Sequence, residues 1–298
     1  RINSFGVVPL EDGDRTTSEG AGVACDLSVV RRVNHTVDVR ELLGLMPWYF
    51  ADLISDAAAP TYLAAWEQLF DKDGFQAPYG LRTAERRHVC YNYSYTHGDC
   101  WNGPSWPYET ARVLTSAANI LNNAAIASAA PLTVESYYGL LLSYARQHTV
   151  TYAANDTASP LGSGHIFENL HADLGYWNNR ERMYWTKSNN RNMGDDYNHS
   201  TFNDLVLSGL LGIRPQKDGT LQIQPLLPNG ISSFRVDHVR VARGRILSMT
   251  WDQHGEHGSP PGLRVYLDGT SPLEPHATPT HQHTLQPPCC STKLPQAN

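Results

Sequence analysis

The spacing of apolar residues changes at Gly212, and this change limits the folds open to the chain. Before Gly212, apolar residues recur every three or four positions, as in 113–121 and 137–145, which is the period of an amphipathic helix. After Gly212 they alternate with polar residues, as in 221–224 and 247–251, which is the period of a half-buried strand. The sequence therefore predicts a helical region followed by a β-module of about four strands.

The helical region divides into predicted helices joined by long polar loops. We predict helices over 39–56 (interrupted by Pro47), over 60–70, from about 105, from an N-cap at Thr133, and over 200–211. The loops 71–104 and 151–199 are long enough to suggest a functional role. The predicted organisation is an irregular segment over 1–36, a helical domain over 37–212, a β-module over 213–270 and a tail without packed structure over 271–298.

Composition excludes several classes of function. A formal net charge of -6 disfavours a nucleic-acid partner, which would select a basic surface. No stretch approaches the roughly 18 consecutive apolar residues of a membrane span, so we expect no membrane partner. We expect a monomer that needs no cofactor.

Cysteines and glycosylation sequons say little about the compartment. The five cysteines include no CxxC pair, so no zinc site is predicted. Cys90 and Cys100 flank one loop, and a disulfide between them is one possibility. Four Asn-x-Ser/Thr sequons, at Asn34, Asn92, Asn155 and Asn198, mildly favour the secretory pathway.

The first chemically unusual segment is the aromatic stretch around Trp101, Asn102, Gly103 and Trp106. Either Trp ring could stack on the face of a pyranose while Asn102 hydrogen-bonds its hydroxyls. The alternative is that both rings are buried anchors of the loop. Composition alone does not decide between these two interpretations.

The second segment holds Glu168 within a loop that contains many polar and aromatic residues, bracketed by Gly164 and Gly175. A carboxylate there is a candidate general base. The alternative is a glutamate that caps a helix or forms an ordinary ion pair with Arg180 or Arg182. Further along, Asp195, Asp196 and His199 precede a predicted helix. Asp196 or Ser200 there could be an N-cap; no third ligand has recognisable spacing, so no metal site is predicted.

Five ordered blocks then resemble a known family. The blocks are VRELLGLMPWYF, GFQAPYGLRTAERR, WNGPSWPYETARVL, IFENLHADLGYW, and DYNHSTFNDLVLSGLLGIRP with LQIQPLLPNG. Together they resemble the mannosylglycerate-hydrolase-like glycoside hydrolases of the six-hairpin glycosidase superfamily, related to glycoside hydrolase family 63. The resemblance covers about Val37 to Asp268.

The resemblance implies a mainly α fold, the C-terminal part of an (α/α)6 toroid followed by a small antiparallel β-module. It implies hydrolysis of a carbohydrate substrate with inversion, in which Glu168 is the general base and Gly175 its partner glycine. By the same comparison Trp101, Asn102, Gly103 and Trp106 line the sugar subsite, and Tyr197, Asn198 and His199 lie near it.

The sequence departs from the family where the general acid is expected. In relatives that aspartate lies upstream of VRELLGLMPWYF. Here only Asp26 and Asp38 are nearby, and neither stands in a matching motif. We therefore expect the base-bearing fragment of a glycosidase, or alternatively a non-catalytic carbohydrate-binding remnant. Glycoside phosphorolysis ranks last, because no Arg cluster or Gly-rich phosphate loop adjoins Glu168.

Overall fold

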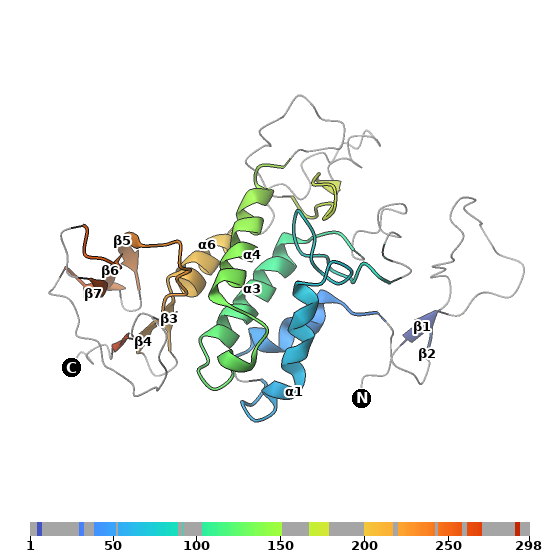
Figure 1. Ribbon diagram of the computed structural model, residues 1–298, viewed down its shortest axis with the longest axis horizontal. Coiled ribbons are helices and arrows are strands. Elements are labelled where there is room, and N and C mark those ends of the chain that lie inside the picture. Colours follow the sequence, from blue (N-terminus) through green and yellow to red (C-terminus); the bar gives the residue numbers. More distant parts are fainter. Residues whose placement is uncertain are drawn as a thin grey trace, which may run out of the picture. The chain divides into compact units, whose positions relative to one another are not determined.

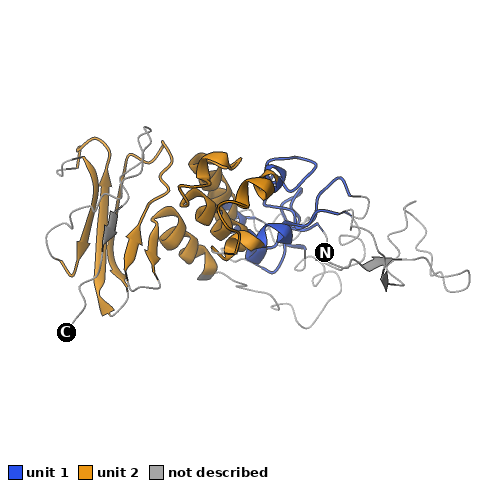
Figure 2. Cartoon of the chain, turned by 90° about the horizontal axis from the view of Figure 1, so that it is seen from below, with its two compact units in different colours: residues 1–46, 65–110, 146–197 blue, residues 47–64, 111–145, 198–298 orange. Residues whose placement is uncertain are grey.

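A computed structural model describes most of the chain between residues 39 and 269. Its described residues are 39–51, 53–88, 91, 103–150, 167–178, 200–216, 220–241, 244–257 and 261–269, with the backbone alone at 5–7, 30–32 and 290–292. The chain divides into two compact units, coloured separately in Figure 2. Unit 1 comprises 1–46, 65–110 and 146–197, and unit 2 comprises 47–64, 111–145 and 198–298.

The first helices are short and mostly of the 3-10 type. They are η1 (Leu42–Tyr49), α1 (Ala59–Leu63) and η2 (Ala64–Leu69). The sequence predicted longer helices over 39–56 and 60–70. Pro47 lies inside η1, where its missing N–H and its ring oppose α-helical hydrogen bonding, and a 3-10 helix is the usual short substitute.

Two long helices follow, α3 (Pro107–Leu121) and α4 (Val134–Gln147), with the short η3 (Ala127–Ala129) between them (Figure 1). The predicted N-cap of α4 is confirmed. Thr133 Oγ1 accepts a hydrogen bond from the Ser136 N–H at 3.0 Å, and Ser136 Oγ accepts one from the Thr133 N–H at 2.9 Å. This reciprocal pair satisfies donors that a helix start leaves without partners.

The last helical segment is α6 (Ser200–Asp204), which continues into the π-helix η4 (Leu205–Leu210). Tyr137 of α4 donates a hydrogen bond of 3.3 Å to the Leu205 carbonyl oxygen. A Cβ atom on Gly209 would collide with the hydroxyl of Tyr137. A glycine at position 209 thus permits the close approach of η4 to α4. The Tyr137 hydroxyl is buried at this contact, and its burial raises its pKa.

The described strands form small antiparallel sheets. One has the order β3 (Ile213–Pro215), β4 (Leu221–Ile223), β8 (Cys290–Thr292); another has the order β5 (Ser233–Arg240), β6 (Ile246–Asp252), β7 (Gly262–Leu267). β1 (Phe5–Val7) pairs with β2 (Val30–Arg32). The prediction of helices followed by a small antiparallel β-module is confirmed, with five strands in 213–270 where about four were predicted.

The β-module has its own apolar core, and the chain enters it through a turn at Gly212. The core residues are Leu211, Ile213, Leu221, Ile223, Leu247, Met249, Val265 and Leu267. Gly212 has φ +66°, and a Cβ there would run into the Gln224 carbonyl. Strand β8 lies in the tail for which the sequence predicted no packed structure, whereas its neighbours 271–289 and 293–298 are outside the described residues.

None of the helices in the described ranges combines the length and the apolar character that crossing a bilayer requires.

Candidate functional site

Glu168 directly precedes a tight hairpin in unit 1. The Asn178 N–H donates to the Asn169 carbonyl at 3.1 Å, and the His171 N–H donates to the Tyr176 carbonyl at 2.8 Å. Leu170 and Trp177 form an antiparallel bridge between these two bonds. Phe167, just before the hairpin, and Trp177 are both buried and meet edge to face with centroids 5.4 Å apart. Glu168 is half-buried at the foot of this fixed turn.

Gly175 closes the hairpin, and its position admits no side chain without strain. Its φ is +75°, in the left-handed region, and its N–H donates to the His171 carbonyl at 2.8 Å. A Cβ atom at 175 would lie 2.5 Å from Cε1 of Tyr79, far inside the ordinary carbon–carbon contact of about 3.5–4.0 Å. The glycine paired with Glu168 by the sequence resemblance thus has a clear steric role.

Backbone pairing joins the hairpin to the Gly103–Trp106 segment. The Ser105 N–H donates to the Leu170 carbonyl and the Leu170 N–H donates to the Ser105 carbonyl, both at 2.8 Å. Trp106 is next to one partner of this pair, and Glu168 is two residues from the other. The two segments singled out from the sequence are therefore side by side.

The Gly103 end of the same segment is held by Thr83. The Gly103 N–H donates to Thr83 Oγ1 at 3.0 Å, and Thr83 Oγ1 donates to the Pro104 carbonyl at 3.0 Å. Gly103 has φ +117°, and a Cβ there would lie 2.8 Å from the Tyr91 carbonyl oxygen. Only glycine fits this position without displacing the backbone.

A triad of Arg82, Tyr91 and the half-buried Asp173 holds the turn of the hairpin. Arg82, 2% exposed, donates to Asp173 Oδ1 and, at 3.0 Å, to the Tyr91 hydroxyl, which donates to Asp173 Oδ2 at 2.6 Å. Partial burial raises the pKa of Asp173, but the hydrogen bonds from Arg82 and Tyr91 outweigh it and lower that pKa overall. Asp173 is therefore ionised at neutral pH and bridges three segments of unit 1.

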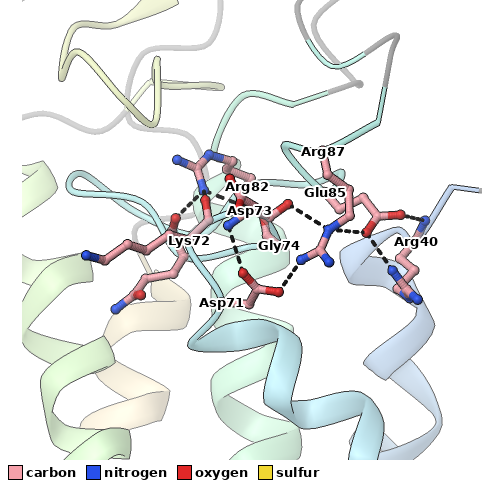
Figure 3. Close-up of polar contacts among 9 residues, drawn as sticks. Arg40, Asp71, Lys72, Asp73, Gly74, Arg82, Glu85 and Arg87 are labelled. Atoms are coloured by element: carbon pink, nitrogen blue, oxygen red, sulfur yellow. Dashed lines mark hydrogen bonds and ion pairs between the residues drawn. The ribbon is translucent and has the colours of Figure 1, made fainter.

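Arg82 also belongs to a polar cluster that orders the segment 71–87 (Figure 3). Its Nη1 donates to the carbonyl oxygens of Lys72, at 2.9 Å, and of Gln76. Nearby, the buried Glu85 carboxylate accepts from Arg40 Nη1 at 2.8 Å and Arg87 Nε at 3.1 Å. Paired charges of this kind can be buried because each carboxylate has partners. These contacts order the described part of the loop, residues 71–87.

Asn169 is 0% exposed, and neither polar atom of its carboxamide has a hydrogen-bond partner among the described residues. Leaving a buried polar group unsatisfied costs about 1–3 kcal/mol. Native proteins usually satisfy such groups with water or a ligand. Asn169 follows Glu168 in the sequence and belongs to the same hairpin.

The structure describes only part of the predicted site. Glu168, Gly103 and Trp106 are described and lie on the two paired segments. Trp101, Asn102, Tyr197, Asn198 and His199 are outside the described residues, as are Asp26, Asp38, Arg180 and Arg182. Trp106 is 2% exposed, which favours the interpretation of its ring as a packing anchor.

Sequence reasoning missed the groups that hold the site together. Arg82 and Asp173 lie within the quoted motifs, but nothing in their spacing pairs residues 91 positions apart. Asn169 stands beside Glu168 in the sequence, and only its complete burial distinguishes it. Within the described ranges, no group of three or more His, Cys, Asp or Glu side chains is arranged to hold a metal ion.

The comparison with family models assigns the class of this domain, a glycoside hydrolase domain. The model described as "Mannosylglycerate hydrolase MGH1-like glycoside hydrolase domain" matches residues 14–200. The chain belongs to this family.

A solved structure named "Sialidase" is also similar, with 33% identity and a TM-score of 0.67 over 89% of this chain. The chain spans 22% of the length of that structure. A comparison with curated proteins gives no significant match.

Proposed function

We propose that the chain carries the general base of an inverting glycoside hydrolase, and that this base is Glu168. The observation that supports the proposal most directly is the double hydrogen bond between Ser105 and Leu170, which brings the base-bearing hairpin beside the aromatic loop. Membership in a glycoside hydrolase family supports glycosidase chemistry in general. The inverting mechanism and the individual roles are our proposal.

In the proposed reaction, the Glu168 carboxylate takes a proton from a water molecule that attacks the anomeric carbon. A protonated aspartic acid on the opposite face gives its proton to the leaving oxygen. Inverting enzymes keep the two carboxyl groups roughly 6.5–9.5 Å apart so that the water fits between them. The hairpin hydrogen bonds at Asn169 and His171, on either side of Leu170, hold the backbone next to Glu168 in place. General-base catalysis requires a base positioned in this way.

The fold around this base is proposed to be the C-terminal part of an (α/α)6 toroid over 37–212, followed in the sequence by the module 213–270. Trp101, Asn102, Gly103 and Trp106 would line the sugar subsite, and Tyr197, Asn198 and His199 would lie near it. Because the Trp106 ring is 2% exposed, Trp106 would contribute to this subsite as a buried anchor of the loop and not by stacking on the sugar. The acid is expected upstream of residue 39, by comparison with relatives.

The proposal is tested with the purified chain and a panel of aryl glycosides: D-glucoside, D-mannoside, L-arabinofuranoside and N-acetylneuraminide, the last because the similar structure is named as a sialidase. For any substrate that is cleaved, Glu168→Gln should lower kcat about 10²–10⁴-fold without a change in Tm. Glu67→Gln, at an exposed glutamate of η2, is the matched control and should be neutral. Equal turnover by parent and Glu168→Gln would remove Glu168 as the base.

The alternative is a carbohydrate-binding domain without an acid. Under this alternative, the parent binds the sugars of the panel in equilibrium titrations and cleaves none of them. Under the hydrolase proposal, binding and turnover occur together, and only turnover is lost in Glu168→Gln. The same set of proteins therefore separates the two functions.

A further inference from the structure

Gln147, the last residue of α4, belongs to unit 1 and is buried. Its Nε2 atom donates to the Tyr79 carbonyl oxygen at 2.9 Å and to Ser105 Oγ at 3.2 Å. A carbonyl oxygen only accepts hydrogen bonds, so the amide nitrogen of Gln147 faces Tyr79. The NH₂ group of Gln147 thus joins two residues that are distant in the sequence, and we call these two hydrogen bonds the amide clamp.

Both acceptors of the amide clamp pair with the first strand of the Glu168 hairpin. Ser105 exchanges two backbone hydrogen bonds of 2.8 Å with Leu170, and the Tyr79 N–H donates to the Ala172 carbonyl oxygen at 3.0 Å. Successive residues of a strand direct their backbone groups to opposite edges, so Leu170 and Ala172 present the same edge. The amide clamp therefore joins two contacts on one edge of this strand.

Gly80 leaves the space that the Gln147 amide occupies. A Cβ atom at position 80 would lie 2.2 Å from Nε2 of Gln147 and 2.4 Å from Oγ of Ser105. Both distances are far below ordinary contact between heavy atoms, and the φ of Gly80, +143°, favours glycine. The backbone at position 80 is thus suited to the close approach of Gln147 and Ser105.

We propose that Gln147 is a positioning residue for Glu168. The amide clamp keeps Tyr79 and Ser105 in place against the strand that follows Glu168 directly, and so fixes the backbone that carries the carboxylate. The assignment rests on the proposed function of Glu168, whereas the clamp itself can be measured without turnover. Positioning matters because a displacement of about 1 Å can lower a rate about a hundredfold.

The first test measures the clamp by amide hydrogen exchange, followed by NMR in the full chain. Gln147→Met keeps the length of the side chain and removes both donated hydrogen bonds. The amides of Leu170 and Tyr79 should then exchange about tenfold faster. The amide of Phe75, which donates to the Gln68 carbonyl in the same unit, should be unchanged. Unchanged exchange at Leu170 and Tyr79, or equal acceleration at Phe75, would overturn the proposal.

The second test determines whether Gln147 acts through Glu168. On a glycoside that the parent cleaves, Gln147→Met should lower kcat about tenfold to a hundredfold. In Glu168→Ala, where azide replaces the attacking water and no base is needed, adding Gln147→Met should leave the azide-dependent rate unchanged. An equal loss in both backgrounds would show a structural role that does not involve the carboxylate, and the proposal would be wrong.

A third readout needs no turnover. The ¹³C chemical shift of the Glu168 carboxyl group depends on its surroundings, so it should change in Gln147→Met. Gln253→Met, the same substitution at an exposed residue of unit 2, is the matched control and should leave this shift, the exchange rates and kcat unchanged. A Glu168 signal that is the same in the parent and in Gln147→Met would contradict the positioning role.

Ser105→Ala provides a milder variant for the case that Gln147→Met does not fold. It removes one acceptor of the amide clamp and keeps the backbone hydrogen bonds to Leu170. Exchange at Leu170 should be faster than in the parent, by less than in Gln147→Met. Parent-like exchange at Leu170 in Ser105→Ala would count against the clamp.

The result is distinguishable from that of the catalytic test. If Glu168→Gln retained full turnover, the proposed base would be wrong, while exchange at Leu170 would still establish or refute the clamp. Conversely, an inactive Glu168→Gln together with full turnover in Gln147→Met would retain the base and remove Gln147 as its positioning residue.

Discussion

Ser105 and Leu170 exchange two backbone hydrogen bonds of 2.8 Å and thereby connect two segments that lie far apart in the sequence. The first contributes Gly103 and Trp106, and the second contributes Glu168 and Asn169. Because the bonds are between backbone atoms, they do not depend on the identity of either side chain. The residues around them determine whether the two segments can approach, and substitutions at these residues test the arrangement.

Gly175→Ala should destabilise unit 1. A non-glycine residue in the left-handed region costs roughly 1–2 kcal/mol, and the added Cβ would in addition press on the Tyr79 ring. Chemical denaturation should show a loss of at least about 1 kcal/mol in the free energy of unfolding, together with reduced turnover.

The matched control for Gly175→Ala is Gly139→Ala. Gly139 is exposed within α4, and a Cβ there meets nothing within 4 Å. Alanine in a helix is favoured over glycine by up to about 1 kcal/mol, so this variant should be stabilised. A Gly175→Ala protein as stable as the parent would show that the hairpin geometry is wrong.

Asp173→Asn should remove a pH-dependent part of the stability. The pKa of Asp173 is lowered in the folded protein by Arg82 and Tyr91, which outweigh the effect of burial. Such a group stabilises the fold fully above its unfolded pKa of about 4, and its contribution is lost as pH falls through the folded pKa. The variant should lose about 1.5–3 kcal/mol at pH 7, as expected for hydrogen bonds to a charged group.

The measurement for Asp173 is the free energy of unfolding of parent and variant between pH 2 and pH 7. The difference should be constant above about pH 5 and should shrink below about pH 4. Asp237→Asn is the control, because Asp237 pairs with Arg235 on an exposed part of β5 and surface pairs contribute little. A difference that grows toward low pH would contradict the triad.

Three glycines in or directly before the β-module should differ in the loss of Tm that each causes when changed to alanine. Gly212 has both a positive φ and a collision with the Gln224 backbone; Gly244 has a positive φ and open space; Gly230 has open space without a positive φ. The loss in Tm should therefore be largest for Gly212→Ala, smaller for Gly244→Ala and near zero for Gly230→Ala. Equal losses in Tm for Gly212→Ala and Gly244→Ala would mean that the Gln224 backbone shifts to accommodate the added Cβ atom.

Local patterns were enough to predict much of the fold. The helical period around Val113, the N-cap at Thr133 and the change of period at Gly212 all depend on interactions between near neighbours in the sequence. The short 3-10 helices were missed, because the apolar pattern around Pro47 suits an α-helix equally well. Strand β8 was also missed, since its pairing with β4 is long-range.

The sequence motifs predicted individual residues of the candidate site but not the contacts between them. Glu168 and Gly175 were assigned from a resemblance, and the steric need for a glycine at 175 depends on Tyr79, nearly a hundred residues earlier. Likewise, the partnership of Arg82 with Asp173 and the unsatisfied amide of Asn169 are properties of packing. No spacing rule along the chain contains this information.

The central claim is that Glu168 activates water, and chemical rescue tests it most directly. On an aryl glycoside that the parent cleaves, Glu168→Ala should be nearly inactive in buffer, because the attacking water has no base. Azide, a nucleophile that needs no deprotonation, should restore leaving-group release and give a glycosyl azide of inverted anomeric configuration, identified by proton NMR. A Glu168→Ala protein that is as active as the parent without azide, or an azide product of retained configuration, would contradict the account.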